Sequence, residues 1–266
     1  MKRLALIALM LTAVAASGMS VRMQMLLWDS AYVAAGDSTI PLDGLLHFWN
    51  MDNVSGTAVY DEIGSATGTL SSAAMIDADY GKYSAGMRTA LTGGVNAYMD
   101  TTVAGLSGVT NATVMMWWRH TQSQGSARYA YYQLLNANDQ NAIAMLGSTT
   151  LGVYFSKSGS GSFSIADFYN ATGVDYGEWH HYCAVFDGAL TTNERIKFYL
   201  DGVRLSPSAY AAGNTTLSSS LPSLLRIGQH YNNNTSADID DFAIYDRSLS
   251  SNEVYSVYSE NQTYAP

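Results

Sequence analysis

The sequence predicts an all-β protein, an antiparallel sandwich of two sheets that ends in one short helix. From residue 42 onward, short stretches of alternating apolar and polar residues recur roughly every 10–15 residues. Turn-forming residues separate them, among them most of the 23 glycines. Only one segment, close to the C-terminus, has the apolar period of a helix. Closely spaced short strands without intervening helices are typical of a sandwich and not of alternating βαβ units.

Each expected strand is a run of four to seven residues rich in aromatic and β-branched side chains. The runs cover residues 45–49, 58–62, 97–101, 113–118, 129–135, 142–146, 151–156, 163–169, 180–186, 196–200, 224–228 and 241–245. The segment FYLDGVRL, residues 198–205, joins two such runs through Asp201 and Gly202. An Asp-Gly pair between alternating apolar residues predicts a two-residue hairpin turn.

The expected helix begins after Ser250. Ser250 and Glu253 have the S-x-x-E spacing of a capping box, and Leu249 and Val254 flank it as a hydrophobic staple. Val254, Val257 and Tyr258 then share one helix face. The sequence therefore predicts a short terminal helix that docks on the sandwich.

The composition excludes several classes of function. Hydrophobic residues make up 47% of the 266 residues, enough for a sizeable core, whereas charged residues make up only 13%, against about 25% in ordinary domains. The net charge is −9, and basic residues cluster only at the N-terminus, so a nucleic-acid partner is not expected. The single cysteine, Cys183, excludes an intramolecular disulfide and lies in an apolar strand, where a buried inert thiol is expected.

Residues 1–16 have a basic start, an apolar stretch and small residues at the end, which predicts a secretory signal peptide. The apolar stretch is too short to span a bilayer, so no membrane span is expected. The alternative is an uncleaved N-terminal helix that packs in an assembly. Residues 17–40 are expected to form an arm or tether, and residues 41–266 the sandwich domain.

Several motifs occur in a fixed order from Gly44 to Tyr258. They are GLLHFWNMDNVSGTAVYDEIG, TVMMWWRH, GEWHHYCAVFDG, IKFYLDGVRL, LRIG and IDDFAIYDRSLSSNEV. In this order the chain resembles the laminin G-like, concanavalin A-like jelly-roll domains of secreted bacterial and phage proteins. The resemblance implies a jelly-roll sandwich, and alternation along the strands is expected to point Trp117, Trp179 and Phe198 into its core.

The carboxylates do not predict catalysis. A retaining glycosidase needs two carboxylates about 5 Å apart, and the hydrolases that share this jelly roll place theirs as Glu-x-Asp-x-x-Glu. The five glutamates, Glu62, Glu178, Glu194, Glu253 and Glu260, form no such motif. The paired histidines His180 and His181 match no zinc motif, and the resemblance makes His181 a structural partner of Trp179. An enzyme is therefore not expected.

The aspartates suit calcium binding better than catalysis, because calcium binds oxygen ligands at turns. Relatives of the resembled type often hold calcium where the opening turn meets the final strand, and by position Asp52 and Asp240 match these two places. Asp241 is expected to point the other way, and Asp238 to cap the preceding loop. The alternative is that Asp240 and Asp241 mark a β-bulge, since Ile239 and Phe242 break the alternation there.

The expected function is an extracellular, non-catalytic module that binds a glycan or glycoprotein. Candidate ligand-binding residues are aromatic or amide side chains in strands and loops: Trp118, Tyr129, Tyr131, His230, Tyr231 and Asn232. Each of the aromatic residues also suits ordinary strand packing. The alternative function is a structural or adhesive subunit of a virion or surface filament, with residues 17–40 contacting other subunits or copies of the chain. An enzyme of unrecognised type is the weakest hypothesis.

Overall fold

A computed structural model describes residues 40–72, 75–89, 97–121, 129–135, 144–147, 150–157, 163–170, 177–210, 215–217, 219, 223–230, 233–234 and 236–259. All of these belong to one compact unit, residues 39–263. The expected signal peptide at residues 1–16 and, apart from Ile40, the expected arm at residues 17–40 lie outside the described residues. Within the described part of the chain, no helix has the length and apolarity needed to cross a membrane.

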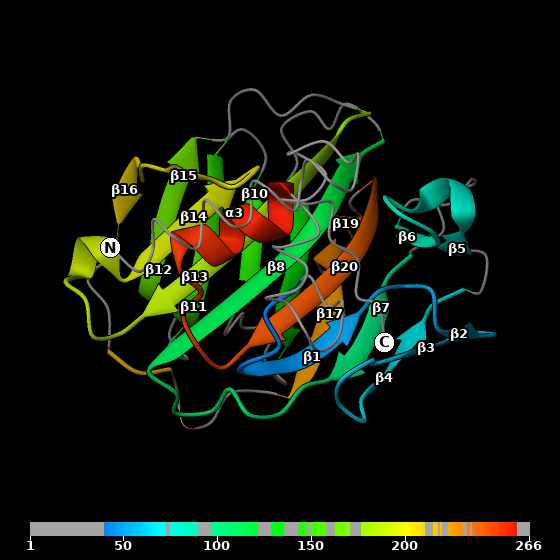
Figure 1. Cartoon of the computed structure of the whole chain (residues 1–266), viewed down its shortest axis with the longest axis horizontal. Helices are drawn as coiled ribbons and strands as arrows, with labels where there is room; N and C mark the ends of the chain where they lie inside the picture. Colours follow the sequence, from blue (N-terminus) through cyan, green and yellow to red (C-terminus); the bar gives the residue numbers. More distant parts are fainter. Residues whose placement is uncertain are drawn as a thin grey trace, which may run out of the picture. The chain divides into compact units, whose positions relative to one another are not determined.

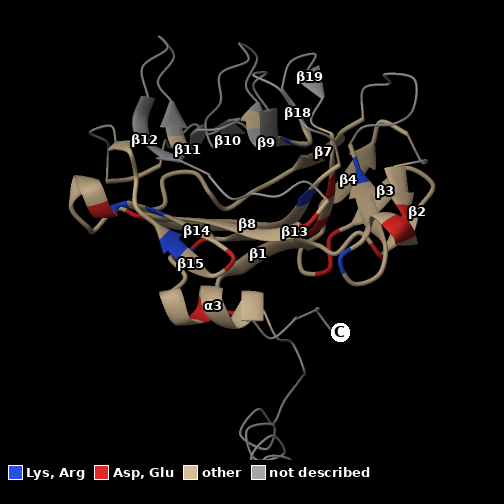
Figure 2. Cartoon of the chain, turned by 90° about the horizontal axis from the view of Figure 1, so that it is seen from above, with Lys and Arg blue, Asp and Glu red and all other residues tan. Residues whose placement is uncertain are grey.

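Two antiparallel sheets pack face to face, and one helix covers the outer side of the first sheet (Figures 1 and 2). This confirms the predicted fold class. In the described residues the first sheet has the order β15-β14-β13-β8-β20-β6-β5, and β1 also pairs with β20. Its strands are β1 (Leu45–Trp49), β5 (Ile76–Asp77), β6 (Gly86–Arg88), β8 (Asn111–His120), β13 (Trp179–Asp187), β14 (Ile196–Leu200), β15 (Val203–Leu205) and β20 (Ala237–Tyr245).

The second sheet has the order β16-β12-β11-β10-β9-β17-β7-β4-β3-β2 over the described strands. These are β2 (Val54–Ser55), β3 (Ala58–Tyr60), β4 (Thr67–Leu70), β7 (Met99–Thr102), β9 (Tyr129–Leu135), β10 (Ala144–Gly147), β11 (Thr150–Lys157), β12 (Phe163–Asn170), β16 (Ala209–Tyr210) and β17 (Leu224–Ile227). A separate ribbon pairs β18 (Gln229–His230) with β19 (Asn233–Asn234), and two 3₁₀ turns span η2 (Ala78–Tyr80) and η3 (Thr192–Glu194).

Every run predicted as a strand overlaps a strand of the structure. The sequence missed β2, β4, β5, β6, β16, β18 and β19, because segments of two to four residues are too short to display a period of two. The Asp201–Gly202 turn is also confirmed. Both residues have positive φ, 52° and 73°, as a type I′ hairpin turn requires.

The core lies between the sheets, and it corrects the expected directions of two tryptophans. On β8 the side chains of Val114, Met116 and Trp118 belong to the core, so Trp117 lies on the opposite face. Trp179 likewise lies on the outer face of β13, two residues before His181. Phe198 is in the core, as predicted. The prediction assigned these tryptophans to the wrong face because β8 is buried on both faces. Apolar character alone therefore does not distinguish the core face of the strand from its outer face.

The second buried face of β8 exists because the predicted helix covers it. Helix α3 (Ser251–Ser259) begins with the expected capping box. Ser250 Oγ accepts from the N–H of Glu253 at 3.3 Å, and Glu253 Oε2 accepts from the N–H of Ser250 at 2.8 Å. Val254 and Val257 are the buried residues of the helix itself. The Cys183 thiol is also buried, which raises its pKa and agrees with the expected inert thiol.

Candidate functional site

Asp240 and Asp241 form a β-bulge in β20, as the alternative reading predicted. Asp240 pairs with Trp117 on β8, but the next regular pair is Ala243 with Met115, so the register shifts between them. Asp241 has a φ of 50°. The bulge allows Ile239 and Phe242, on either side of the two aspartates, to reach the core.

Asp240 holds a loop that connects η2 to β6. Its Oδ2 accepts hydrogen bonds from the backbone N–H groups of Lys82, at 2.8 Å, and Tyr83, at 3.3 Å. Asp52 Oδ1 accepts from the N–H of Ala85 at 2.8 Å. The two aspartates therefore fix both halves of the segment between Gly81 and Gly86.

The glycines at the two ends of this loop leave no room for side chains. A Cβ at Gly81 would collide with the carbonyl of Ser84, and a Cβ at Gly86 would collide with the carbonyl of Tyr80. Because the backbone approaches itself so closely at these glycines, and because the aspartates hold the loop by hydrogen bonds, the loop has one defined conformation.

Burial shapes the electrostatics of the aspartates. Burial, and then the charge of Asp52, raise the pKa of Asp240 to about 7 against the effect of its backbone hydrogen bonds. Burial and the charges of Asp240 and Asp52 raise the pKa of Asp241 well above its usual value. Asp241 Oδ2 is buried and has no hydrogen-bond partner among the described residues. The three aspartates therefore interact electrostatically and form an acidic cluster at the bulge.

In the described part of the chain, no three His, Cys, Asp or Glu side chains are placed to hold one metal ion together. Both oxygens of Asp240 already accept backbone hydrogen bonds, Oδ1 from the N–H of Asp241 at 2.9 Å. Asp240 is thus used to hold the chain. The buried oxygen that lacks a donor is on Asp241, not on the predicted Asp240.

Beside the loop lies a pocket of about 330 Å³ on the outer face of the first sheet, at the end of α3. Its lining combines three aromatic side chains, an ammonium and a hydroxyl: Trp117, Trp179, Tyr258, Lys82 and Ser259. The Lys82 Nζ lies 4.6 Å from the centre of the Trp117 ring. The Trp117 and Tyr258 rings are 6.0 Å apart at an interplanar angle of 31°.

His181 packs under this pocket. Its ring centre is 5.2 Å from that of Trp117, and burial lowers its pKa to about 4. It is therefore a neutral structural group at neutral pH. The resemblance made it a partner of Trp179; in the described structure its ring neighbours are Trp117 and Tyr258, whose ring centre is 6.5 Å away.

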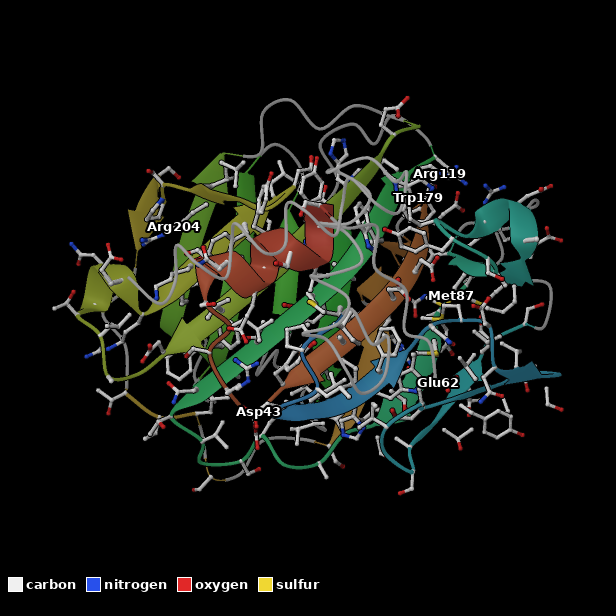
Figure 3. The ribbon with its side chains drawn as sticks, viewed as in Figure 1. Asp43, Glu62, Met87, Arg119, Trp179 and Arg204 are labelled. Carbon is white, nitrogen blue, oxygen red and sulfur yellow. The ribbon has the colours of Figure 1, made fainter. Side chains whose placement is uncertain are left out.

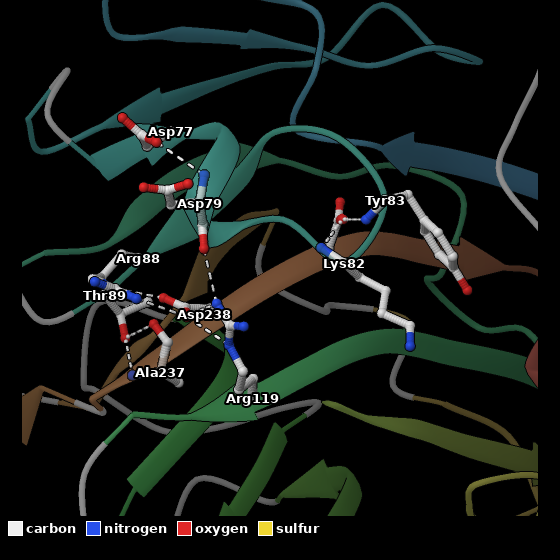
Figure 4. Close-up of polar contacts among 10 residues, drawn as sticks. Asp77, Asp79, Lys82, Tyr83, Arg88, Thr89, Arg119, Ala237 and Asp238 are labelled. Atoms are coloured by element: carbon white, nitrogen blue, oxygen red, sulfur yellow. Dashed lines mark hydrogen bonds and ion pairs between the residues drawn. The ribbon is translucent and has the colours of Figure 1, made fainter. Parts of the chain in front are cut away.

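Trp179 is held from the other side by Arg119, whose guanidinium carbon is 4.9 Å from the ring centre (Figure 3). Arg119 itself donates to Asp238 Oδ2, at 2.9 Å from Nε and 2.7 Å from Nη2. Asp238 is fully buried and also accepts two hydrogen bonds from Arg88, at 2.6 and 2.9 Å (Figure 4). Asp238 is thus the shared anion of two arginines. It was expected to cap the preceding loop, and residues 231, 232 and 235 of that loop lie outside the described structure.

The predicted ligand-binding residues are not part of this pocket in the described structure. Trp118 is fully buried in the sandwich core, which corrects the expectation that it stacks on a ligand. Tyr129, Tyr131 and His230 lie in strands, but their side chains are outside the described structure, and so are Tyr231 and Asn232 altogether. The pocket residues were missed because Lys82 and Tyr258 come from distant segments. The one local signal was GKYSAG, a lysine within a short loop bounded by glycines.

The chain belongs to the concanavalin A-like lectin/glucanases superfamily, whose sequence model matches residues 92–255. Similar solved structures include the binding domain of botulinum neurotoxin serotype D, with 12% identity, a TM-score of 0.60, and coverage of 82% of this chain and 52% of that one. The binding domain of Paraclostridial Mosquitocidal Protein 1 has 14% identity and a TM-score of 0.61 over 82% and 52% of the two chains.

The binding domain of botulinum neurotoxin DC, solved in complex with SialylT, has 11% identity, a TM-score of 0.62, and coverage of 83% of this chain and 52% of that one. This chain therefore spans about half the length of these structures, and the likeness at such low identity shows the fold. A sequence search of curated proteins finds no significant match.

Proposed function

We propose that this protein is a non-catalytic extracellular module that binds glycans in the pocket formed by Lys82, Trp117, Trp179, Tyr258 and Ser259. The observation that carries the proposal is the lining of the pocket. Binding sites for small ligands are concave, largely aromatic or apolar, and carry a few polar groups that orient the ligand.

The chemistry of this lining suits a sugar ring. A pyranose has faces made of C–H bonds and a rim of hydroxyl groups. The half-buried Trp179 and Tyr258 offer aromatic faces to the C–H groups. The Lys82 ammonium and the Ser259 hydroxyl offer hydrogen bonds to the rim.

The same lining supports a non-catalytic role. Of the described residues that line the pocket, none carries a carboxyl group, whereas glycoside hydrolysis needs two. The family and the structural neighbours support binding as well, since the neighbours are described as binding domains and one is solved with SialylT.

We also propose a structural calcium ion near the β20 bulge, held by carboxylate oxygens of Asp52 and Asp241, with backbone carbonyls and water completing its six to eight ligands. The buried Asp241 Oδ2 without a donor fits such a cation, as does the concentration of negative charge around it. The ion would neutralise these carboxylates and stabilise the chain around the bulge. Asp240 would hold the loop beside it.

The alternative function, a virion or filament subunit, depends on residues 17–40, which lie outside the described structure. It remains a prediction of the sequence, as does export through residues 1–16. An assembly role would appear as a stable oligomer that residues 17–40 are needed to form.

A glycan array tests the proposed function. The purified chain, labelled for fluorescence, is expected to bind a subset of the immobilised glycans. Trp179→Ala is expected to lose them, because this side chain forms one wall of the pocket. Tyr60→Ala serves as the matched control, since Tyr60 is an exposed aromatic residue outside the pocket. Retention of all glycans by Trp179→Ala would contradict the proposal.

A further inference from the structure

We infer that the pocket beside α3 selects a sugar that carries a carboxylate, such as a uronic or sialic acid, and that the Lys82 ammonium is the group that selects it. This inference rests on the proposed glycan-binding function and specifies its ligand class. It is carried by the charge on the described lining of the pocket and by the placement of Lys82.

The charged group in the described lining of the pocket is a cation, the Lys82 ammonium, although the protein has a net charge of −9. Among the lining residues that the structure describes, Lys82 is the one cation and none is acidic. The described residues place no carboxylate in ion-pair contact with the Lys82 ammonium. An ammonium with no counter-ion at a concave aromatic surface is arranged to meet an anion.

Arg119 does not compete for this role. Its Nε and Nη2 donate to Asp238, and Nη2 also donates to the carbonyl of Asp79 at 2.9 Å. Its guanidinium stacks on Trp179, outside the lining of the pocket. The two cations therefore have separate tasks: Arg119 positions the aromatic wall, and Lys82 is left to bind.

The position of Lys82 is fixed before any ligand arrives. Its backbone N–H is held by the buried Asp240, the loop is closed by glycines that admit no side chain, and the ammonium lies over both the Trp117 and Tyr83 rings, at 4.6 and 5.7 Å. A preorganised cation loses less conformational entropy on binding than a freely moving lysine.

The pocket volume of about 330 Å³ is at the small end of the range for ligand sites, about 300–1,000 Å³, which favours a single sugar unit.

Paired probes that differ only in the carboxylate test the inference by titration calorimetry. Methyl β-D-glucuronide is compared with methyl β-D-glucoside, and the methyl α-glycoside of N-acetylneuraminic acid with its C1 amide. The intact chain is expected to bind an acidic probe at least about tenfold more tightly than its neutral partner, the difference typical of a charge-assisted hydrogen bond. High salt is expected to reduce that ratio.

Lys82→Gln is expected to weaken binding of the acidic probe much more than that of the neutral probe, which brings the ratio close to one, and Lys82→Arg is expected to restore the preference. Lys197→Gln is the charge-matched control, since Lys197 lies on β14 outside the pocket. Glu260→Gln is made in parallel, because this carboxylate follows Ser259 in the sequence, and equal or tighter binding of the acidic probe is expected.

The outcomes separate the two proposals. Binding of neutral and acidic probes with equal affinity, lost in Trp179→Ala, would overturn the inference and leave the glycan-binding function standing. A preference for acidic probes that survives in Lys82→Gln would also overturn it, because another cation would then select the ligand. If no glycan on the array binds, both the inference and the proposed glycan-binding function are contradicted.

Discussion

Asp240 accepts a hydrogen bond of 2.8 Å from the backbone N–H of Lys82, a residue 158 positions earlier in the chain. The last strand of the sandwich thereby fixes the loop that carries the cation of the pocket. The acidic cluster at the bulge and the candidate binding site are parts of one local structure, although they come from opposite ends of the domain.

Removal of the Asp240 carboxylate is expected to weaken both stability and binding. In Asp240→Ala, the N–H groups of Lys82, Tyr83 and Asp241 lose their acceptor, at a cost of about 1–3 kcal/mol of unfolding free energy. Affinity for the glycans found on the array is expected to fall as well, although Asp240 does not line the pocket. Urea denaturation and calorimetry measure the two effects. Unchanged affinity would show that the loop does not need this anchor.

Calcium removal is expected to lower the melting temperature of the native protein. A cation bound to the folded state and not to the unfolded state adds stability that rises with its concentration. The test is a thermal melt in excess chelator and in increasing calcium. Asp241→Asn is expected to abolish the calcium effect, whereas Asp43→Asn, at a carboxylate whose side chain is 94% exposed, is expected to retain it. Identical melts with chelator and calcium would rule out the structural ion.

The anion shared by Arg88 and Arg119 is expected to contribute strongly to stability. Asp238→Asn would leave two guanidinium groups around a buried neutral amide, and we expect a loss of about 3 kcal/mol, the low end for breaking a buried ion pair. Glu194→Gln breaks the exposed pair with Arg204 and is expected to cost less than about 1 kcal/mol. Comparable losses in the two variants by chemical denaturation would refute this contrast.

The capping carboxylate gives a defined pH dependence. Hydrogen bonds from Arg247 and from Ser250 lower the pKa of Glu253 from 4.5 to about 2, although partial burial acts in the opposite direction. Because the folded state holds the ionised form, this contribution to stability is complete above about pH 4.5 and is lost as the pH falls towards 2. The difference in stability between the native protein and Glu253→Gln is expected to shrink over that interval. A difference that stays constant from pH 6 to pH 2 would contradict it.

Trp118, in the core, and Trp179, in the wall of the pocket, are expected to respond differently to mutation. Trp118→Ala removes a fully buried core side chain and is expected to cost about 3–5 kcal/mol. Trp179→Ala removes a half-buried ring and is expected to affect ligand binding far more than unfolding. Denaturation curves and array binding of both variants measure this. A stability loss in Trp179→Ala as large as in Trp118→Ala would assign Trp179 to the fold.

The sequence predicted those features that depend on neighbours along the chain. The strand positions, the Asp201–Gly202 turn, the capping box at Ser250 and Glu253, and the bulge at Asp240 and Asp241 are all local patterns of polarity and backbone preference. Each was readable because the physical cause, a turn conformation or a period of two, acts over a few residues.

Only the tertiary structure decided which face of β8 is the core and where the pocket lies. Trp117 and Trp118 are equally apolar, and the helix that buries the outer face hides the difference between them. The pocket unites Lys82 with Trp117, Trp179 and Tyr258, residues brought together by sheet pairing and helix docking. Such long-range contacts leave no mark on local sequence, because the free energy that forms them comes from burial between distant segments.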